Sequence, residues 1–286
     1  MPELPEVETV RLFLNQKIIG KKIKSIKVLN AKSLSGDYKK ILNQPIIRLT
    51  RLGKQLSIHF SHGLSFLIHL KMTGQLIFVD KSQTILGHPT LSLYKKPLPW
   101  NTTRLIFIFS DGSILYFNDQ RKFGWIKLVK QDQLTRLQSN LGPDILSKKF
   151  TLSYFQKTLQ NSNRLIKTLL HDQSLYAGIG NIYANDALFL SHIHPQTTAS
   201  NITSTQTKSL YHNIKKVIRQ GIKYSGSTAK DNMYLKPDGT KGSQQYNFYV
   251  YQRAGQPCSS CRSKIIRLKL QGRSAFFCPH CQKLSN

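Results

Sequence analysis

The chain has 286 residues, 40% of them hydrophobic, so it is long enough for two domains with ordinary cores. Its 42 lysines and arginines against 13 acidic residues give a net charge of +29. Such an excess favours a polyanionic partner, and because the cations are spread along the whole chain we expect a nucleic-acid-binding surface on folded domains. Apolar runs of about 18 residues and a signal-peptide core are both missing, so we expect no transmembrane helix, no membrane partner and a cytosolic protein.

The first six residues, Met1 to Glu6, combine two prolines with two carboxylates. Removal of Met1 would leave Pro2 with a free secondary amine, a nucleophile that no other standard amino acid supplies. A secondary amine condenses with an aldehyde to give an iminium, which is an electron sink for elimination at the neighbouring carbon. The alternative is that Pro2 and Pro5 only stiffen the terminus, and these six residues do not decide between the two interpretations.

The first half of the chain is predicted to contain one helix followed by many short strands. The helix spans residues 5 to about 16, because Pro5 suits the first helical position and Glu6 and Glu8 suit the positive end of the helix dipole. Asp111-Gly112 lies between two alternating apolar runs and predicts a hairpin. The predicted strands are 22–29, 46–49, 56–60, 64–70, 76–79, 105–109, 114–117 and 125–129. So many short strands favour a β-sandwich or a barrel.

The apolar periodicity becomes helical after the turn at Leu141-Gly142-Pro143-Asp144. The predicted helices are 151–160, 163–171, 181–191 and 205–224. Residues 225–245 are rich in glycine, serine, lysine and aspartate and are predicted to form a long loop, of a length that is usually functional or disordered. Residues 246–251 are predicted to form a strand. The fold class is therefore α+β.

The cysteines form two CxxC pairs, at Cys258/Cys261 and Cys278/Cys281, separated by 16 residues. This spacing predicts one tetrahedral zinc site, structural because four thiolates leave no open coordination position. Coincidental or redox-active pairs are the alternative. His280 is expected at the surface rather than among the ligands. The intervening segment carries several cations, among them Lys264, Arg267, Lys269 and Arg273, and is typical of a hairpin that contacts nucleic acid.

Two further motifs suit contact with nucleic acid. Ala177-Gly178-Ile179-Gly180-Asn181 precedes a predicted helix, whose free N–H groups could hold a phosphate, although such a motif is more often a simple turn. Asp119-Gln120-Arg121-Lys122-Phe123-Gly124 follows a predicted strand and places cations beside an aromatic ring that could wedge between bases. A strand-end turn with a core Phe123 is the alternative, and Met72 at another strand end would ordinarily be a core residue.

Taken together, these residues resemble the formamidopyrimidine-DNA glycosylase family. The matching motifs occur in the order of the family and span the whole chain. They are the start Met1-Pro2-Glu3-Leu4-Pro5-Glu6-Val7-Glu8-Thr9, Leu52-Gly53-Lys54, His69-Leu70-Lys71-Met72-Thr73-Gly74, Arg121-Lys122-Phe123-Gly124, Leu141-Gly142-Pro143-Asp144, Ala177 to Ala184, and Gly272-Arg273-Ser274 to Cys281.

The resemblance implies a bifunctional base-excision repair enzyme that extrudes oxidised purines, chiefly 8-oxoguanine and formamidopyrimidines, from duplex DNA. It implies that Pro2 attacks C1′ and forms a Schiff base, and that Glu3 is the acid that protonates the sugar or the leaving group. Lys54 would supply the proton for β-elimination and Arg273 the proton for δ-elimination. Glu6 is expected to support the N-terminus through hydrogen bonds rather than to act as a second acid.

The resemblance also implies the DNA contacts and the architecture. Met72, Arg121 and Phe123 would fill and probe the gap in the duplex, Lys167 and Asn181 would hold phosphates, and a loop at residues 227–234 would cover the extruded base. The implied segments are a catalytic β-sandwich with an N-terminal helix (1–133), a helix-two-turn-helix domain (134–225), and the lesion-covering loop with the zinc-finger hairpin (226–286). One structural zinc, no organic cofactor and a monomer in the cytoplasm, associated with the nucleoid, are expected.

Three departures from the family pattern leave the implied catalytic residues in place. Thr102-Thr103 replaces a usual His-Thr pair, Asp119-Gln120-Arg121 replaces Asp-Pro-Arg, and Tyr251-Gln252-Arg253 replaces Tyr-Gly-Arg.

Two alternative functions stay open. One is an endonuclease VIII-like glycosylase with the same fold and the same Pro2 chemistry, acting on oxidised pyrimidines. The other is a non-catalytic DNA-binding protein with a zinc finger.

Overall fold

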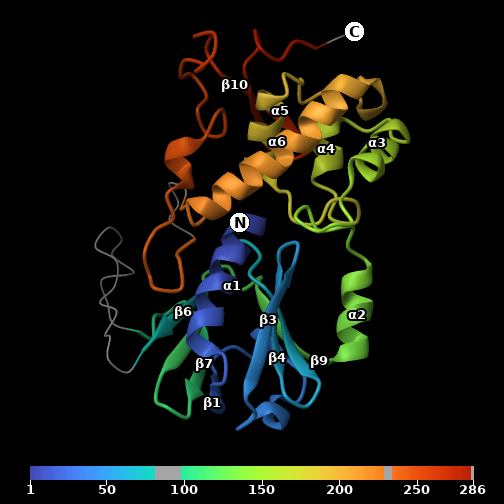
Figure 1. Cartoon of the computed structure of the whole chain (residues 1–286). Helices are drawn as coiled ribbons and strands as arrows, with labels where there is room; N and C mark the ends of the chain where they lie inside the picture. Colours follow the sequence, from blue (N-terminus) through green and yellow to red (C-terminus); the bar gives the residue numbers. More distant parts are fainter. Residues whose placement is uncertain (81–97, 229–233, 285–286) are drawn as a thin grey trace. The chain divides into compact units, whose positions relative to one another are not determined.

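The computed structural model describes residues 1–80, 98–228 and 234–284 (Figure 1). The chain divides into two compact units, one of residues 1–139 and 224–245 and the other of residues 140–223 and 246–286. Residues 224–245 therefore pack with the N-terminal strands, although the helical region lies between them in the sequence. The three-segment division inferred from the sequence stays a prediction.

The first unit is a β-sandwich, as the sequence predicted. Its described strands form two sheets, in the orders β1-β7-β8-β6 and β2-β9-β5-β4-β3. The strands are β1 (Ile23–Val28), β2 (Leu34–Ser35), β3 (Ile46–Leu52), β4 (Gln55–Phe60), β5 (Leu64–His69), β6 (Gly74–Val79), β7 (Thr103–Phe109), β8 (Ile114–Asp119) and β9 (Trp125–Lys130). The two short 3₁₀ helices η1 (Ala31–Ser33) and η2 (Tyr38–Ile41) follow β1 and β2.

Alternation along the strands divides the apolar side chains between two faces. Phe117 of β8 lies in the core between the sheets, whereas its neighbour Tyr116 faces outwards. Trp100 and Leu235 cover that outer face, and the N–H of Phe78 donates to the carbonyl of Pro237 at 2.8 Å. The segment that follows residue 233 is thereby held on the sheet of the first unit.

Helix α1 (Leu4–Ile18) packs on β3 and β4, as Figure 1 shows. Its buried apolar face includes Val7, Val10, Leu14 and Ile18. Helix α2 (Gln131–Ser139) was not predicted. Leu134 is its one buried side chain, so little of this helix belongs to a core.

The second unit is helical. Its helices are α3 (Leu152–Gln160), α4 (Ile166–Leu170), α5 (Asn181–Leu190) and α6 (Ser204–Lys223), with the short 3₁₀ helix η4 (Ala199–Asn201). Helix α4 is shorter than the predicted 163–171 because Leu165 is extended and bridges to Thr198. In the part of the chain that the structure describes, no helix has the length and apolar character needed to cross a membrane.

The strand predicted at residues 246–251 is wrong. The chain there forms the 3₁₀ helix η5 (Gln244–Asn247) and turns. The N–H groups of Val250 and Tyr251 donate to the Asp186 carboxylate at 3.0 and 3.2 Å, so a side chain takes the place of a neighbouring strand. The hairpin β10 (Ile266–Leu270) and β11 (Arg273–Phe277) follows.

Candidate active site and nucleic-acid interface

The N-terminal segment is built into the first unit rather than frayed. Met1 is 43% exposed, and residues 2–7 are buried. Glu3 is the N-cap of α1, where its N–H donates to Oε2 of Glu6 at 2.8 Å and its carbonyl accepts the N–H of Val7 at 3.1 Å. This capping box satisfies free donors of the helix end and fixes the direction in which Pro2 enters the helix.

Glu6 also ties the N-terminus to the segment around residue 226. Its Oε1 accepts the N–H of Ser227 at 2.8 Å, and the Tyr234 hydroxyl donates to the carbonyl of Ser225 at 3.2 Å. Gly226 has φ +76°, and a Cβ there would lie 2.9 Å from Cγ of Glu6, so glycine permits the close approach. Glu6 therefore makes hydrogen bonds of the kind expected to support the N-terminus. Of the loop predicted to cover the base, residues 229–233 lie outside the described residues.

Lys54 lies in the turn between β3 and β4 and is 7% exposed. Arg51 joins this turn to α1, because its guanidinium donates to Glu8 at 2.8 Å and to the carbonyl of Gly53 at 2.9 Å. Burial alone would raise the pKa of Glu8, but hydrogen bonds from Arg11 and Arg51 outweigh it and hold that pKa below its usual value. A charged pair thus links the helix of the N-terminal residues to the turn of Lys54.

His69, at the end of β5, lies in the electrostatic field of Lys54. Its Nδ1 accepts the N–H of Lys71 at 3.0 Å. Burial lowers the pKa of His69 to about 3, and the charges of Lys71 and Lys54 add to the effect. The imidazole is therefore neutral at pH 7, and the positive charges near it are those of Lys54 and Lys71.

Met72, Arg121 and Phe123 lie at the ends of β5 and β8 and point away from the core. Met72 is 38% and Phe123 54% exposed. The guanidinium carbon of Arg121 lies 4.9 Å from the centre of the Phe123 ring, a cation–π distance. The alternative of a core Phe123 is therefore wrong, and Met72 is not a core filler.

Lys167 and Asn181 meet in the second unit. Lys167 on α4 is 2% exposed, and its Nζ donates to Oδ1 of Asn181 at 2.8 Å. Asn181 is the first residue of α5, directly after the glycine turn. Gln173 braces that turn, accepting the N–H of Gly178 at 3.0 Å and donating to the carbonyl of Ile179 at 2.9 Å. A lysine ammonium and a helix N-terminus thus lie side by side.

Arg273 is the first residue of β11 and is exposed. Gln271 and Gly272 precede it with φ of 45° and 79°, as in a two-residue hairpin turn with both central residues left-handed. Arg273 and Lys167 line one cavity of about 280 Å³. Its other lining residues are Arg164, Thr168, His171, Asp172, Leu270 and Gln271. Pro2, Glu3 and Lys54 belong to the first unit and Arg273 to the second.

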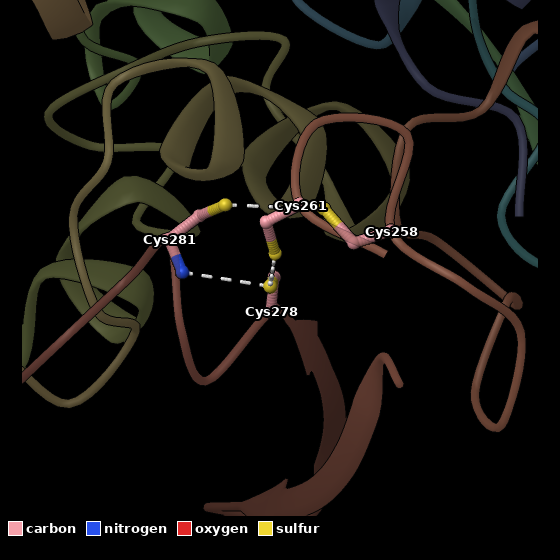
Figure 2. A group of neighbouring side chains, drawn as sticks. All are labelled: Cys258, Cys261, Cys278 and Cys281. Atoms are coloured by element: carbon pink, nitrogen blue, oxygen red, sulfur yellow. Dashed lines mark hydrogen bonds between the residues drawn. The ribbon is translucent and has the colours of Figure 1, made fainter. Parts of the chain in front are cut away.

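The four cysteines converge, as Figure 2 shows. All four Sγ atoms lie within 4.8 Å of one another, with 3.9 Å between Cys258 and Cys281 and 3.4 Å between Cys261 and Cys278. These separations exceed a disulfide bond of about 2 Å and suit four thiolates around a tetrahedral ion at about 2.3 Å. The donor set therefore fits zinc. Among the described residues, this is the one group of at least three cysteine, histidine or acidic side chains able to hold a metal.

Sequence reasoning missed two buried polar residues of α5 that hold the cysteine region. Asn185 and Asp186 are each 1% exposed. Oδ1 of Asn185 accepts the N–H of Phe276 at 2.8 Å, and Asp186 accepts the N–H groups of Val250 and Tyr251. Burial raises the pKa of Asp186 to about 6, against the opposing effect of these hydrogen bonds. The signal in the sequence is a polar pair inside an otherwise apolar helix.

Comparison with known families matches three consecutive parts of the chain. Residues 1–126 match the formamidopyrimidine-DNA glycosylase N-terminal domain, and residues 141–233 match the formamidopyrimidine-DNA glycosylase H2TH domain. Residues 255–284 match a zinc finger found in FPG and IleRS. The third match includes all four converging cysteines.

Individual relatives match over the full length. A formamidopyrimidine-DNA glycosylase of Pelotomaculum thermopropionicum is 37% identical, over 99% of this chain and 100% of the relative. The crystal structure of the MutM (Fpg) protein of Thermus thermophilus is 33% identical, with a TM-score of 0.86 and complete coverage of both chains. A mutant of Lactococcus lactis Fpg, solved with Fapy-dG-containing DNA, is 30% identical, with a TM-score of 0.86 over 99% of this chain and 100% of that one.

Proposed function

The chain belongs to the formamidopyrimidine-DNA glycosylase family, and from that premise we propose that it is a bifunctional DNA glycosylase and AP lyase for oxidised purines. The observation that carries the proposal is the N-terminus. Pro2 is followed by a buried Glu3, and Glu6 holds both the helix start and Ser227. A terminus that only stiffened the chain would have no need of two buried carboxylates, whose burial is costly without partners.

In the proposed reaction, removal of Met1 exposes the secondary amine of Pro2, which attacks C1′ of the extruded nucleotide. The bond from C1′ to the base breaks and the base leaves with a proton. The bond from C1′ to the ring oxygen also breaks as that oxygen is protonated, so the sugar opens and the nitrogen of Pro2 forms the iminium, with Glu3 as the acid for the sugar or the leaving group. The resulting iminium acidifies C2′, and loss of that proton expels the 3′ phosphate. Lys54 and then Arg273 serve the β- and δ-eliminations, where a cation beside each departing phosphate stabilises its charge.

The DNA contacts are proposed from two properties of the described residues, the exposure of their side chains and their charge. Met72, Arg121 and Phe123 enter the duplex where the damaged nucleotide leaves it. Lys167 and Asn181 hold a phosphate, since an ammonium and a helix N-terminus together favour an anion. Lactococcus lactis Fpg was solved with Fapy-dG-containing DNA, which supports a purine lesion as substrate. It was also solved with DNA that contains an oxidised pyrimidine, so the two lesion classes need a direct comparison.

The four cysteines are proposed to bind one structural zinc ion, with no organic cofactor. Four thiolates close the coordination sphere, so the ion would stabilise the fold of the hairpin segment rather than take part in the reaction. The buried pair Cys258 and Cys278 and the half-buried pair Cys261 and Cys281 supply the ligands. A monomer acting in the cytoplasm on nucleoid DNA completes the proposal.

Borohydride trapping tests the role of Pro2. The wild-type protein, with Met1 removal verified by intact mass, should form a covalent adduct with DNA that contains 8-oxoguanine opposite cytosine. Pro2→Gly should lose most of the adduct, because it removes the secondary amine. Pro5→Ala is the matched control, since it changes the other proline of the hexamer and leaves the amine in place. Undiminished trapping by Pro2→Gly would refute the assignment, and no trapping by the wild type would favour the non-catalytic alternative.

The substrate class needs a separate comparison. Duplexes with 8-oxoguanine opposite cytosine and with thymine glycol opposite adenine should be cleaved under the same single-turnover conditions. We expect faster cleavage of the 8-oxoguanine duplex. Preference for thymine glycol would instead support the endonuclease VIII-like alternative, while leaving the Pro2 chemistry intact.

A further inference from the structure

Asp119 is a fully buried carboxylate at the last position of β8, with an exposed fraction of 0%. A buried carboxylate is costly unless donors surround it. Its Oδ2 accepts the N–H of Gly124 at 2.6 Å, and its Oδ1 accepts the Thr73 hydroxyl and the N–H of Arg121, the latter at 3.2 Å. The backbone is held as well, because Nε of Arg104 donates to the carbonyl of Asp119 at 2.8 Å.

These contacts join two separate loops. Thr73 directly follows Met72, and its hydroxyl oxygen also accepts the N–H of Arg121 at 3.0 Å. The Asp119 side chain thus fastens the turn of Met72 to the turn of Arg121 and Phe123. The large side chains of Met72 and Phe123 project from these turns into solvent.

The second turn is backbone-strained, which makes its anchoring necessary. Lys122 has φ +59°, a left-handed conformation that costs free energy in a residue with a Cβ. A Cβ at Gly124 would lie 3.0 Å from Oδ2 of Asp119 and 2.9 Å from Cζ of Phe117. Glycine at this position therefore lets the carboxylate capture the N–H directly and close the turn.

We propose that Asp119 is a positioning residue that keeps Met72, Arg121 and Phe123 rigid enough to open duplex DNA. This inference rests on the proposed function and names a residue to which that function assigns no role. A side chain that wedges between stacked nucleobases can separate them only if the turn that carries it does not move. One carboxylate hydrogen-bonded to both turns provides that rigidity.

The test uses Asp119→Asn. The asparagine keeps one acceptor oxygen, but its NH₂ group replaces the other carboxylate oxygen and faces an N–H donor there, so one hydrogen bond is lost. Thr73→Val is the second variant, because it keeps the shape of Thr73 and removes the hydroxyl link. Asp111→Asn is the matched control. Asp111 lies at the other end of the same pair of strands and likewise accepts a backbone N–H, that of Ser113 at 3.0 Å. Phe123→Ala serves as a reference for loss of the wedge.

Two measurements separate positioning from general stabilisation. Fluorescence of 2-aminopurine beside the lesion reports duplex opening independently of chemistry, and nicking of a preformed abasic site in single-stranded DNA reports the reaction without a duplex. Asp119→Asn and Thr73→Val should slow opening by about tenfold or more, as Phe123→Ala does, yet nick the single strand within about twofold of wild type. Asp111→Asn should match wild type in both assays.

Three outcomes would overturn the inference. Unchanged duplex opening in a folded Asp119→Asn protein is the first, and an equal loss in both assays is the second, because it would indicate a general structural role. If Asp119→Asn does not fold, unchanged opening by Thr73→Val is the third. Failure of the proposed function looks different: the wild-type protein would open lesion duplexes without excising or nicking.

Discussion

His59 is a buried histidine whose two ring nitrogens both have hydrogen-bonding neighbours. The hydroxyl oxygens of Thr50 and Ser65 lie 2.7 Å from Nε2 and 2.8 Å from Nδ1. Burial, followed by the charge of Arg48, lowers the pKa of His59 to about 4, so the native ring is neutral at pH 7. Between about pH 6.5 and pH 4 the unfolded chain binds a proton that the folded ring does not, so stability falls as the pH is lowered through that window.

We expect the wild-type protein to lose about 2 kcal/mol more unfolding free energy between pH 7 and pH 5 than His59→Gln. Urea unfolding followed by tryptophan fluorescence measures it, because Trp100 and Trp125 both belong to the first unit. Equal losses in the two proteins would contradict the prediction.

The sequence indicates single candidate residues of the site where a motif carries them. Pro2, Glu3, Lys54 and Phe123 lie in short runs that indicate a family only when all the runs are read together in chain order, and the roles of these residues stay predictions. The supporting residues were not predictable. Asp119 lies within a quoted motif, but its partners are Thr73 in the turn before β6 and Arg104 in β7, and the sequence does not reveal which donors converge on a buried carboxylate.

Helix α5 contacts both the Lys167 side chain and the β10–β11 hairpin that carries Arg273. Its first residue, Asn181, accepts a hydrogen bond from Lys167, and its fifth, Asn185, accepts the N–H of Phe276 in the strand that begins with Arg273. The same helix therefore helps to place both the proposed phosphate site and the hairpin. This arrangement gives the hairpin an anchor besides the cysteines.

Asn185→Ala should weaken lesion-DNA affinity by about tenfold, because removing the acceptor leaves the buried N–H of Phe276 unsatisfied, at a cost of about 1–3 kcal/mol. Its zinc content should stay at that of wild type. Asn163→Ala is the matched control, since Asn163 is exposed in the same unit and accepts a single hydrogen bond of 3.2 Å from Ser200. Titration of fluorescent lesion duplex, together with metal analysis, measures both quantities. Wild-type affinity in Asn185→Ala would show that the cysteines alone place the hairpin.

Most regular elements were predicted well. Apart from β2, the strands of the sandwich lie where apolar runs indicated, and helices α1, α3, α5 and α6 overlap the predicted helices. Helix α2 and the segment 246–251 were not. Helix α2 buries only Leu134, and residues 246–251 form no strand because Asp186 binds the N–H groups of Val250 and Tyr251.

The whole molecule carries a charge of +29, which should dominate its affinity for DNA. Each phosphate neutralised by a cation releases counterions, so the logarithm of the binding constant should fall linearly and steeply with the logarithm of salt concentration.

Lys167→Ala should reduce the slope of that line by about one, because it removes one proposed phosphate contact. Phe123→Ala is the control: it should weaken binding without changing the slope, since it removes an apolar contact. Binding isotherms on one lesion duplex over a series of salt concentrations provide the measurement. An unchanged slope in Lys167→Ala would argue against a phosphate at the Lys167–Asn181 site.

At this largest scale, composition and local patterns determined the kind of molecule: a basic α+β protein with a strand-rich first half, a helical second half and four cysteines spaced for one metal. Those conclusions depend on charge and on side-chain periodicity, which are properties of neighbouring residues. Only the tertiary structure decided that residues 224–245 return to the N-terminal unit, that Glu6 bonds Ser227, and that Asp119 binds both turns. Each of these depends on which distant polar groups share a buried space, and a linear pattern does not encode that.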